Sequence, residues 1–189
     1  MPRPLYFHIK SILFIALANL ATNATLAQTE KIYWDEARTL QWEDYKGQPE
    51  ALEHESALTT CNIEVGYKAK LENEKLVITP KVKAFFNPQR SWVNETHKNE
   101  QTLRHERVYF TITELFARKI RQAFAETNFD TETYKTEIKK ITKENLDAMW
   151  EYRDKYGIET FFGSKKVEQA QWEKNIQLEM MELGEYTGN

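Results

Sequence analysis

The chain has 189 residues, a formal net charge of −3, six glycines and a single cysteine. Its balance of 41% hydrophobic and 29% charged residues excludes a disordered chain and a multi-spanning membrane protein. One cysteine excludes an internal disulfide framework and cysteine-rich metal sites, and a pI near 5.9 does not favour nucleic acid as a partner.

Residues 1–27 have the pattern of a secretory signal. Two basic side chains are followed by an apolar run over residues 12–20 and by small residues before a cleavage point after Ala27. The run is about half the roughly 20 residues that a membrane-spanning helix needs. We therefore expect cleavage and export to the periplasm or the medium, with no transmembrane segment in the mature chain. Residues 28–189 would then hold 24 basic and 29 acidic side chains, a net charge of −5.

The first half of the mature chain is rich in strand signals. Residues 58–67 alternate in part and contain β-branched and aromatic side chains, residues 71–75 form a polar turn, and residues 76–86 resemble a second strand. Together they predict an antiparallel hairpin, in which Pro80 indicates an edge position or a bulge. Cys61 falls on the first strand, where burial as a small hydrophobic residue is favoured over an intermolecular disulfide.

Helical periodicity dominates the second half of the chain. It predicts a first helix over residues 101–125, with Asn99 as its N-cap. Two further helices are predicted over residues 131–155 and 164–183. Gly157 is expected to break the second helix, so that residues 156–163 form a loop.

These elements predict one α+β domain over residues 28–189. A hairpin from the β-rich residues 33–92 would pack on long helices from residues 98–183, because the chain shows no repeat, low-complexity tract or linker. On the third helix, helical spacing predicts an inward face made of Val167, Ala170, Ile176 and Met180.

The segment that could carry chemistry lies in the first predicted helix. The zinc-hydrolase signature His-Glu-x-x-His places two imidazoles on one helix face to hold one metal ion, and its glutamate activates a metal-bound water. Here His105 and Glu106 supply the first two positions, but Tyr109 stands where the second histidine belongs. Alone, a His-Glu pair on a helix is common and favours a structural role.

Four segments in order resemble a bacterial family of predicted secreted zinc-dependent proteases, a domain of unknown function. Residues 40–47 (LQWEDYKG) resemble its Leu-x-Trp-x-Asp-aromatic-x-Gly segment, and residues 86–93 (FNPQRSWV) are similar to its aromatic-Asn-Pro-x-x-Ser-Trp-Val segment. Residues 103–119 resemble its His-Glu-x-x-His-Phe-Asp helix, and residues 156–163 (YGIETFFG) its later Glu-Thr-x-His segment. The resemblance implies a zincin-like fold, with His105 as a metal ligand and Glu106 as the general base.

The departures from that family concern the metal ligands. Tyr109 and Phe162 stand at the positions of two of the three histidines, and Thr111 replaces an acidic residue. A catalytic zinc needs about three protein ligands and a water. A phenol with a pKa near 10 must lose its proton to bind well, and a phenyl ring has no donor atom. The resemblance therefore implies vestigial roles for His105 and Glu106.

The mature chain has two further histidines, His54 and His97, that could serve as ligands. His97 would lie about 12 Å along a helix axis from His105, which is too far for both to bind one metal directly. His54 falls in a loop whose position the sequence does not fix. Acidic residues could also substitute, but none can be placed at the site from sequence.

Three functions remain open at this stage. The favoured one is an exported, catalytically inactive protein on a protease-like scaffold, without a cofactor, that binds a peptide or an envelope protein. The second is an active zinc metallopeptidase that uses His105 and Glu106, with an atypical ligand set that could include Tyr109 and a carboxylate or His54. The third is a structural protein of the cell envelope.

Overall fold

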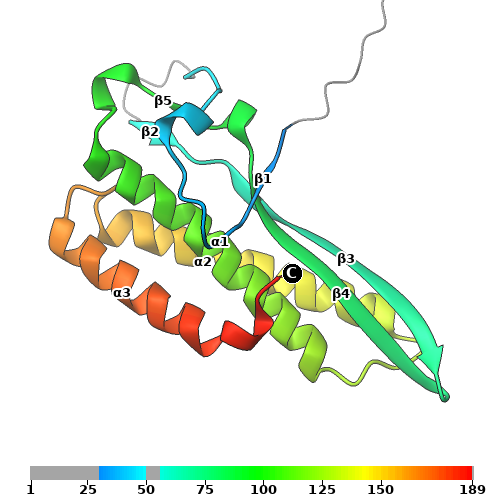
Figure 1. The fold of residues 1–189 in the computed structure, drawn as a ribbon. Coiled ribbons are helices and arrows are strands. Elements are labelled where there is room, and N and C mark those ends of the chain that lie inside the picture. Colours follow the sequence, from blue (N-terminus) through cyan, green and yellow to red (C-terminus); the bar gives the residue numbers. More distant parts are fainter. Residues whose placement is uncertain (1–29, 50–55, 189) are drawn as a thin grey trace, which may run out of the picture.

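A long β-hairpin lies beside three helices in the computed structural model, which describes residues 30–49 and 56–188 (Figure 1). The α+β prediction is confirmed. The predicted signal sequence and His54 lie outside the described residues. Within the described ranges, no helix is long and apolar enough to cross a membrane. The elements are β1 (Ile32–Tyr33), β2 (Ala57–Leu58), β3 (Cys61–Glu72), β4 (Lys75–Phe86), β5 (Trp92–Val93), α1 (Glu100–Glu126), α2 (Tyr134–Glu159) and α3 (Lys166–Glu182).

The predicted hairpin is confirmed, and its strands are longer than expected. β3 and β4 pair antiparallel over twelve residues each. The turn residues Asn73 and Glu74 have φ values of 49° and 66°, the two-residue geometry whose twist matches that of paired strands. β1 pairs with β4 only at Phe85 and Phe86. At Pro80, β4 therefore has only β3 beside it among the described strands, which is the predicted edge position.

Helix α1 is the central element of the fold. It packs against β3 and β4, and also against α2 and α3. Residues 113–118 are all buried, as expected of a helix enclosed on every side. The predicted N-cap is also confirmed, because the Asn99 side chain accepts a hydrogen bond of 2.9 Å from the backbone N–H of Thr102.

The hairpin contributes its inner face to the core around α1. Ile63, Val82, Ala84 and Phe86 alternate with exposed or half-buried residues and are each at most 8% exposed. Cys61 belongs to the same face and is buried, with its Sγ 3.0 Å from the Thr113 hydroxyl. The prediction that Cys61 packs as a small buried residue is therefore confirmed.

The expected break at Gly157 is wrong, because α2 continues to Glu159. Gly157 is needed for a close approach instead: a Cβ on it would lie 2.9 Å from the Tyr109 hydroxyl. The chain leaves α2 through Phe161, Phe162 and Gly163, whose φ values of 46°, 50° and 85° are all left-handed. Three such residues end the helix and reverse the chain toward α3.

The predicted inward face of α3 is only half correct. Ile176 is buried and Met180 is half-buried, but Val167 is 81% exposed and Ala170 is also exposed. Gln169 takes the inward position with 1% exposure. An apolar pattern could not find it, because hydrogen bonds satisfy its amide: the oxygen accepts from Gln101 of α1, and the nitrogen donates to Glu173 of α3.

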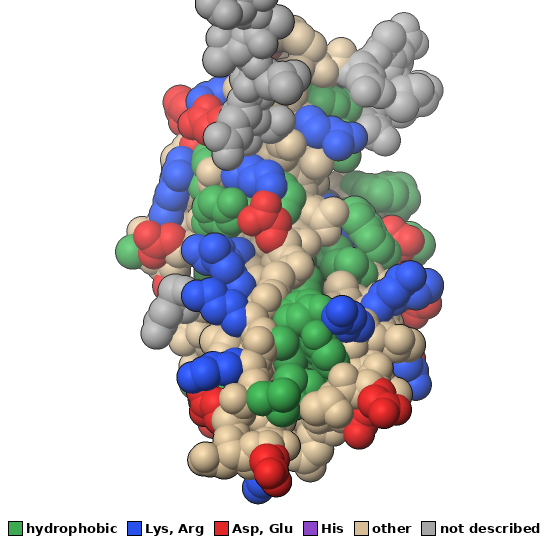
Figure 2. Space-filling model, turned by 90° about the vertical axis from the view of Figure 1, so that its right-hand side faces the viewer, with side chains coloured by type: hydrophobic (Ala, Val, Ile, Leu, Met, Phe, Trp, Pro, Cys, Tyr) green, Lys and Arg blue, Asp and Glu red, His purple; other side chains and the backbone are tan. Residues whose placement is uncertain are grey.

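A shallow groove of about 440 Å³ separates β3 from α2. It is lined by Val65 and Tyr67 of the strand and by Ile138, Leu146 and Trp150 of the helix. Figure 2, which faces the hairpin side, shows hydrophobic side chains gathered in a strip with lysine and arginine side chains along it. The helix therefore covers the hairpin incompletely.

A buried cluster of charges joins α1 to the rest of the fold. The Glu114 carboxylate accepts hydrogen bonds from Arg118 Nε at 3.2 Å and from Arg121 Nη1 at 2.9 Å. Arg121 also donates to the backbone carbonyls of Val82 on β4 and Tyr186 near the C-terminus. One carboxylate thus orients two guanidinium groups that hold the hairpin and the C-terminal segment against α1.

We expect Glu114→Gln to lower the free energy of unfolding by about 3 kcal/mol, because both guanidinium groups would stay buried without their shared carboxylate. Urea denaturation at pH 7 measures the change. Glu144→Gln is the matched control, since Glu144 lies 3.9 Å from Lys140 on an exposed face of α2 and should change stability by less than about 0.5 kcal/mol. Equal effects of the two substitutions would contradict the assignment.

Candidate functional site

The predicted site lies in the first half of α1, where His105, Glu106 and Tyr109 occupy the first, second and fifth positions of the degenerate motif. The i, i+4 spacing brings the His105 and Tyr109 rings onto one face, with centroids 5.1 Å apart and planes at 81°. The predicted juxtaposition of these two side chains is therefore confirmed.

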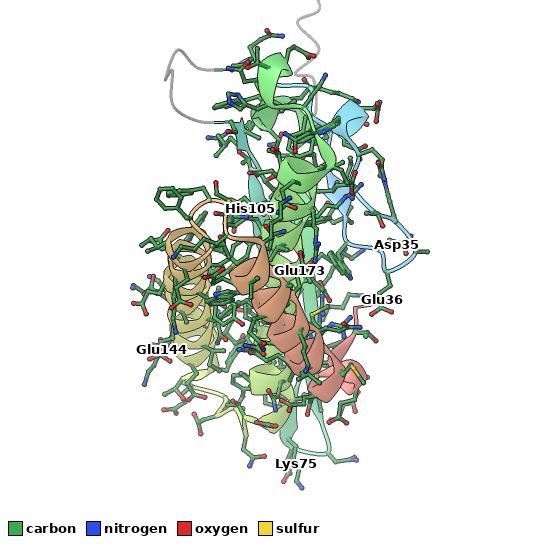
Figure 3. All side chains as sticks on the ribbon, turned by 90° about the vertical axis from the view of Figure 1, so that its left-hand side faces the viewer. Asp35, Glu36, Lys75, His105, Glu144 and Glu173 are labelled. Atoms are coloured by element: carbon green, nitrogen blue, oxygen red, sulfur yellow. The ribbon has the colours of Figure 1, made fainter. Side chains whose placement is uncertain are left out.

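His105 is enclosed by aromatic and backbone groups. Its ring stacks on Tyr156 of α2 at 4.8 Å and 20°, and the Tyr156 hydroxyl donates to the His105 carbonyl at 3.2 Å. Gly163 covers the other side: a Cβ there would lie 2.8 Å from His105 Cγ and 3.2 Å from Nδ1. Figure 3 shows His105 beside the turn that leads into α3, with Glu173 further along that helix.

Enclosure changes the chemistry of the imidazole. Burial lowers the pKa of His105 from 6.5 to about 4, against the weaker opposing effect of the Glu173 charge. The side chain is therefore neutral at pH 7. Its Nδ1 is buried and has no hydrogen-bond partner among the described residues, and a Cβ on Gly163 would lie 3.2 Å from this nitrogen.

Tyr109 is held as a protonated phenol. Burial raises its pKa above the usual value of 10, and the charge of Glu106 adds to the effect. The ring packs edge-on against Tyr156 at 5.2 Å, and the Arg153 guanidinium lies over it at 5.0 Å. These contacts make Tyr109 part of the packing between α1 and α2.

Glu106 is 5% exposed and lies among phenols. Burial and, to a smaller extent, the Glu106 charge raise the pKa of Tyr45 and of Tyr109. The same charge contributes to the raised pKa of Tyr156. The carboxylate therefore sits close to the residues that surround His105, where the motif predicts a general base.

Phe162 is near the site but does not fill it. It lies beside Tyr109 at Gly157, where a Cβ would be 3.4 Å from Phe162 Cε1. Phe162 does not fill the position of the missing histidine, because the residue is 71% exposed. The fully buried Tyr156 closes the site instead.

Sequence reasoning missed Tyr156 and Arg153. Both come from α2, and the predicted helix end at residue 155 left Tyr156 in a loop. Arg153 is buried and donates to the carbonyls of Cys61 and Thr59, so it also links α2 to the start of β3. The signal that could have found them is the spacing of Arg153, Tyr156 and Gly157 on one helix face.

The described residues at this turn offer a metal few donor atoms besides the imidazole, because the Tyr109 phenol keeps its proton and Phe162 has no donor atom. In residues 30–49 and 56–188, no three His, Cys, Asp or Glu side chains are close enough together to hold a metal. His97 lies before α1 in an exposed 3₁₀ turn, with its Nδ1 3.2 Å from the Thr96 hydroxyl.

We expect Gly163→Ala to lower the free energy of unfolding by about 2 kcal/mol, because an added Cβ would meet the His105 ring and alanine disfavours a φ of 85°. Thermal or urea denaturation measures it. In Gly184→Ala, the added Cβ meets nothing within 4 Å, and stability should change little. A neutral Gly163→Ala would show that this turn does not close on His105.

The lowered pKa of His105 predicts a pH dependence of stability. The unfolded chain binds a proton at His105 near pH 6.5, whereas the folded chain binds it only near pH 4. The contribution of the neutral His105 to the free energy of unfolding is therefore complete above pH 6.5. It decreases by about 3 kcal/mol as the pH falls toward 4. His105→Phe should flatten the unfolding free energy over this range in urea titrations. His97→Phe, at an exposed position, should leave the profile unchanged, and an unchanged profile in His105→Phe would contradict the burial argument.

Comparisons with protein-family models, with curated proteins and with solved structures found no match for this chain. The resemblance to secreted zinc-dependent proteases therefore stays a prediction that depends on the four sequence segments. The geometry that bears on it is local: one helix turn with His105 and Glu106, closed by Tyr109 and Tyr156.

Proposed function

We propose that the protein is an exported, catalytically inactive member of a zinc-protease-like family that binds a peptide or an envelope protein. The observation that carries the proposal is the aromatic enclosure of His105 by Tyr109 and Tyr156. A catalytic zinc site keeps three donor atoms and one open position. Here the corresponding turn has one neutral imidazole, a protonated phenol and tightly packed rings.

The turn between α2 and α3 supports a binding role. Ile158, Phe161 and Phe162 are 68%, 63% and 71% exposed and lie next to the enclosed site. Large apolar side chains grouped on a surface are typical of contact sites for other molecules. The surface around the former site would then serve as a contact surface for another molecule, and the turn would provide its apolar part.

One observation favours an active zinc metallopeptidase as the second candidate. Glu106 is buried beside a neutral His105, which is the protonation state that a zinc ligand needs. That candidate requires further ligands from elsewhere in the chain, and His54 is one that the described residues do not include.

Elemental analysis of the purified protein after dialysis against zinc tests the proposal. We expect far less than one zinc per chain and no peptidase activity. Stoichiometric zinc, together with peptidase activity that Glu106→Gln abolishes, would contradict the proposal and establish the second candidate.

Restoring two imidazoles tests the position of the site. Tyr109→His with Phe162→His should bind zinc with a Kd in the micromolar range or better, about 8 kcal/mol of binding free energy, measured by calorimetry. The matched control is Tyr109→Phe with Phe162→Leu, which adds no donor atom and should not bind. A folded double-histidine variant that binds no zinc would show that the site is misplaced.

A further inference from the structure

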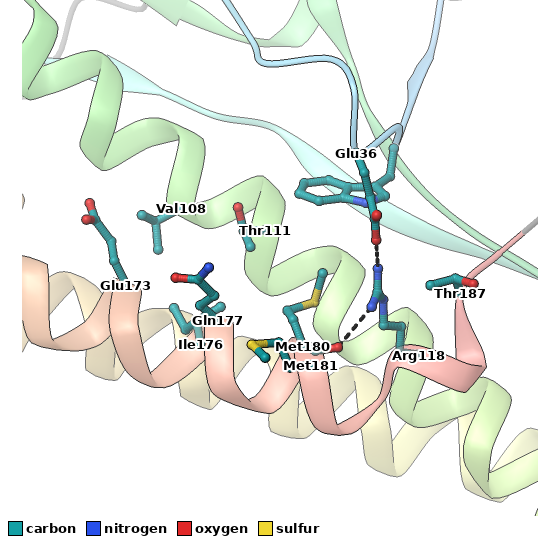
Figure 4. Close-up of a pocket in the computed structure, with 12 residues that line it drawn as sticks. Glu36, Val108, Thr111, Arg118, Glu173, Ile176, Gln177, Met180, Met181 and Thr187 are labelled. Carbon is teal, nitrogen blue, oxygen red and sulfur yellow. Dashed lines mark hydrogen bonds and ion pairs between the residues drawn. The ribbon is translucent and has the colours of Figure 1, made fainter.

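A cavity lies between α1 and α3, on a different face of α1 from His105 and Tyr109. Its volume is about 640 Å³, which is in the range of small-molecule sites. Figure 4 shows the two helices as its walls, with Glu36 and Thr187 from other parts of the chain at one end. The apolar part of the lining consists of Trp34, Val108, Ile176, Met180 and Met181.

A buried positive charge lies at that end of the cavity. Among the described residues, Glu114 is the carboxylate that lies between Arg118 and Arg121, and these three buried side chains together carry one net positive charge. The balancing charge comes from Glu36, which pairs with Arg118 from a turn after β1. The Arg118 side chain is 4% exposed, whereas that of Glu36 is 67% exposed.

The unequal exposure shows which partner can be exchanged. Arg118 is fixed by Glu114 and by a hydrogen bond of 2.9 Å to the Met180 carbonyl. Glu36 has only its end at the cavity and can return to water at little cost, because an exposed ion-pair partner contributes little to stability. A carboxylate from another molecule would keep the charges balanced in its place.

We propose that this cavity binds an aliphatic carboxylate, whose carboxylate group replaces Glu36 on Arg118 and whose chain lies along Val108, Ile176 and the two methionines. The positive charge of the buried cluster favours an anionic ligand, and the apolar walls of the cavity favour an aliphatic chain. Methionine side chains are unbranched and adapt to flexible chains. The inference does not depend on the proposed function, because it uses neither His105 nor Glu106.

Two polar side chains of the lining, Glu173 and Thr111, favour an aliphatic chain over a peptide. Glu173 is paired with Arg104, and the Thr111 hydroxyl donates to the Arg107 carbonyl. These groups are therefore already engaged and offer little to the N–H and C=O groups of a peptide backbone, which would lose free energy when buried without partners.

Calorimetric titration of the purified protein with decanoate, below its micellar concentration, tests the proposal. We expect one binding site, with decan-1-ol binding at least tenfold more weakly because it lacks the charge. Octanoate should bind about fifteenfold more weakly than decanoate, since each buried methylene is worth about fourfold.

Two substitutions locate the site. Glu36→Gln removes the internal competitor and should strengthen decanoate binding by about fivefold, the upper range for an exposed ion pair. Glu43→Gln removes the same charge from an exposed position outside the cavity and should change nothing. Gly184→Phe adds a ring where the Cβ has open space and should weaken binding at least tenfold.

Three results would overturn the proposal. Equal affinities for decanoate and decan-1-ol would show that Arg118 does not bind the carboxylate group. Unchanged binding in both Glu36→Gln and Gly184→Phe would place the ligand elsewhere. Tighter binding of acetyl-trileucine, a peptide acid of comparable hydrophobicity, would replace the aliphatic ligand class with a peptide.

Discussion

The enclosure of α1 on every side is the constraint on which the rest of the structure depends. The hairpin, α2 and α3 all bury their apolar faces against this one helix. Polar side chains on α1 therefore have to find partners inside the protein. Glu114, Arg118 and Arg121 do so by pairing with each other and with backbone carbonyls, whereas His105 avoids the cost of a buried charge by remaining neutral.

The same enclosure decides what the degenerate motif can do. An imidazole that stacks on Tyr156 and touches Gly163 has the protonation state of a metal ligand but not its surroundings. Tyr109 occupies the next turn and packs against Tyr156, and burial favours its neutral form. The side chains on this helix face could either take part in chemistry or pack against neighbouring elements. In the described residues they mostly pack.

Periodicity predicted the elements that contain strong, regular patterns. The hairpin and α1 follow from alternation and from an amphipathic repeat with an asparagine cap. Gly157 was misread because sequence cannot distinguish a glycine that ends a helix from one that admits a neighbouring phenol. Gln169 and the Glu114 cluster were missed because their burial depends on long-range partners, which no local pattern contains. The helical juxtaposition of His105 and Tyr109 could be predicted, whereas Tyr156 required the true end of α2.

The left-handed backbone at Phe161 and Phe162 costs the turn after α2 part of its stability. Bulky side chains in the left-handed region cost about 1 kcal/mol or more each, and glycine or asparagine would occupy the same positions more easily. Local strain of this kind persists where the rest of the fold enforces it. Two phenyl rings exposed to water on a strained reversal therefore lower the local stability and give this corner an apolar surface.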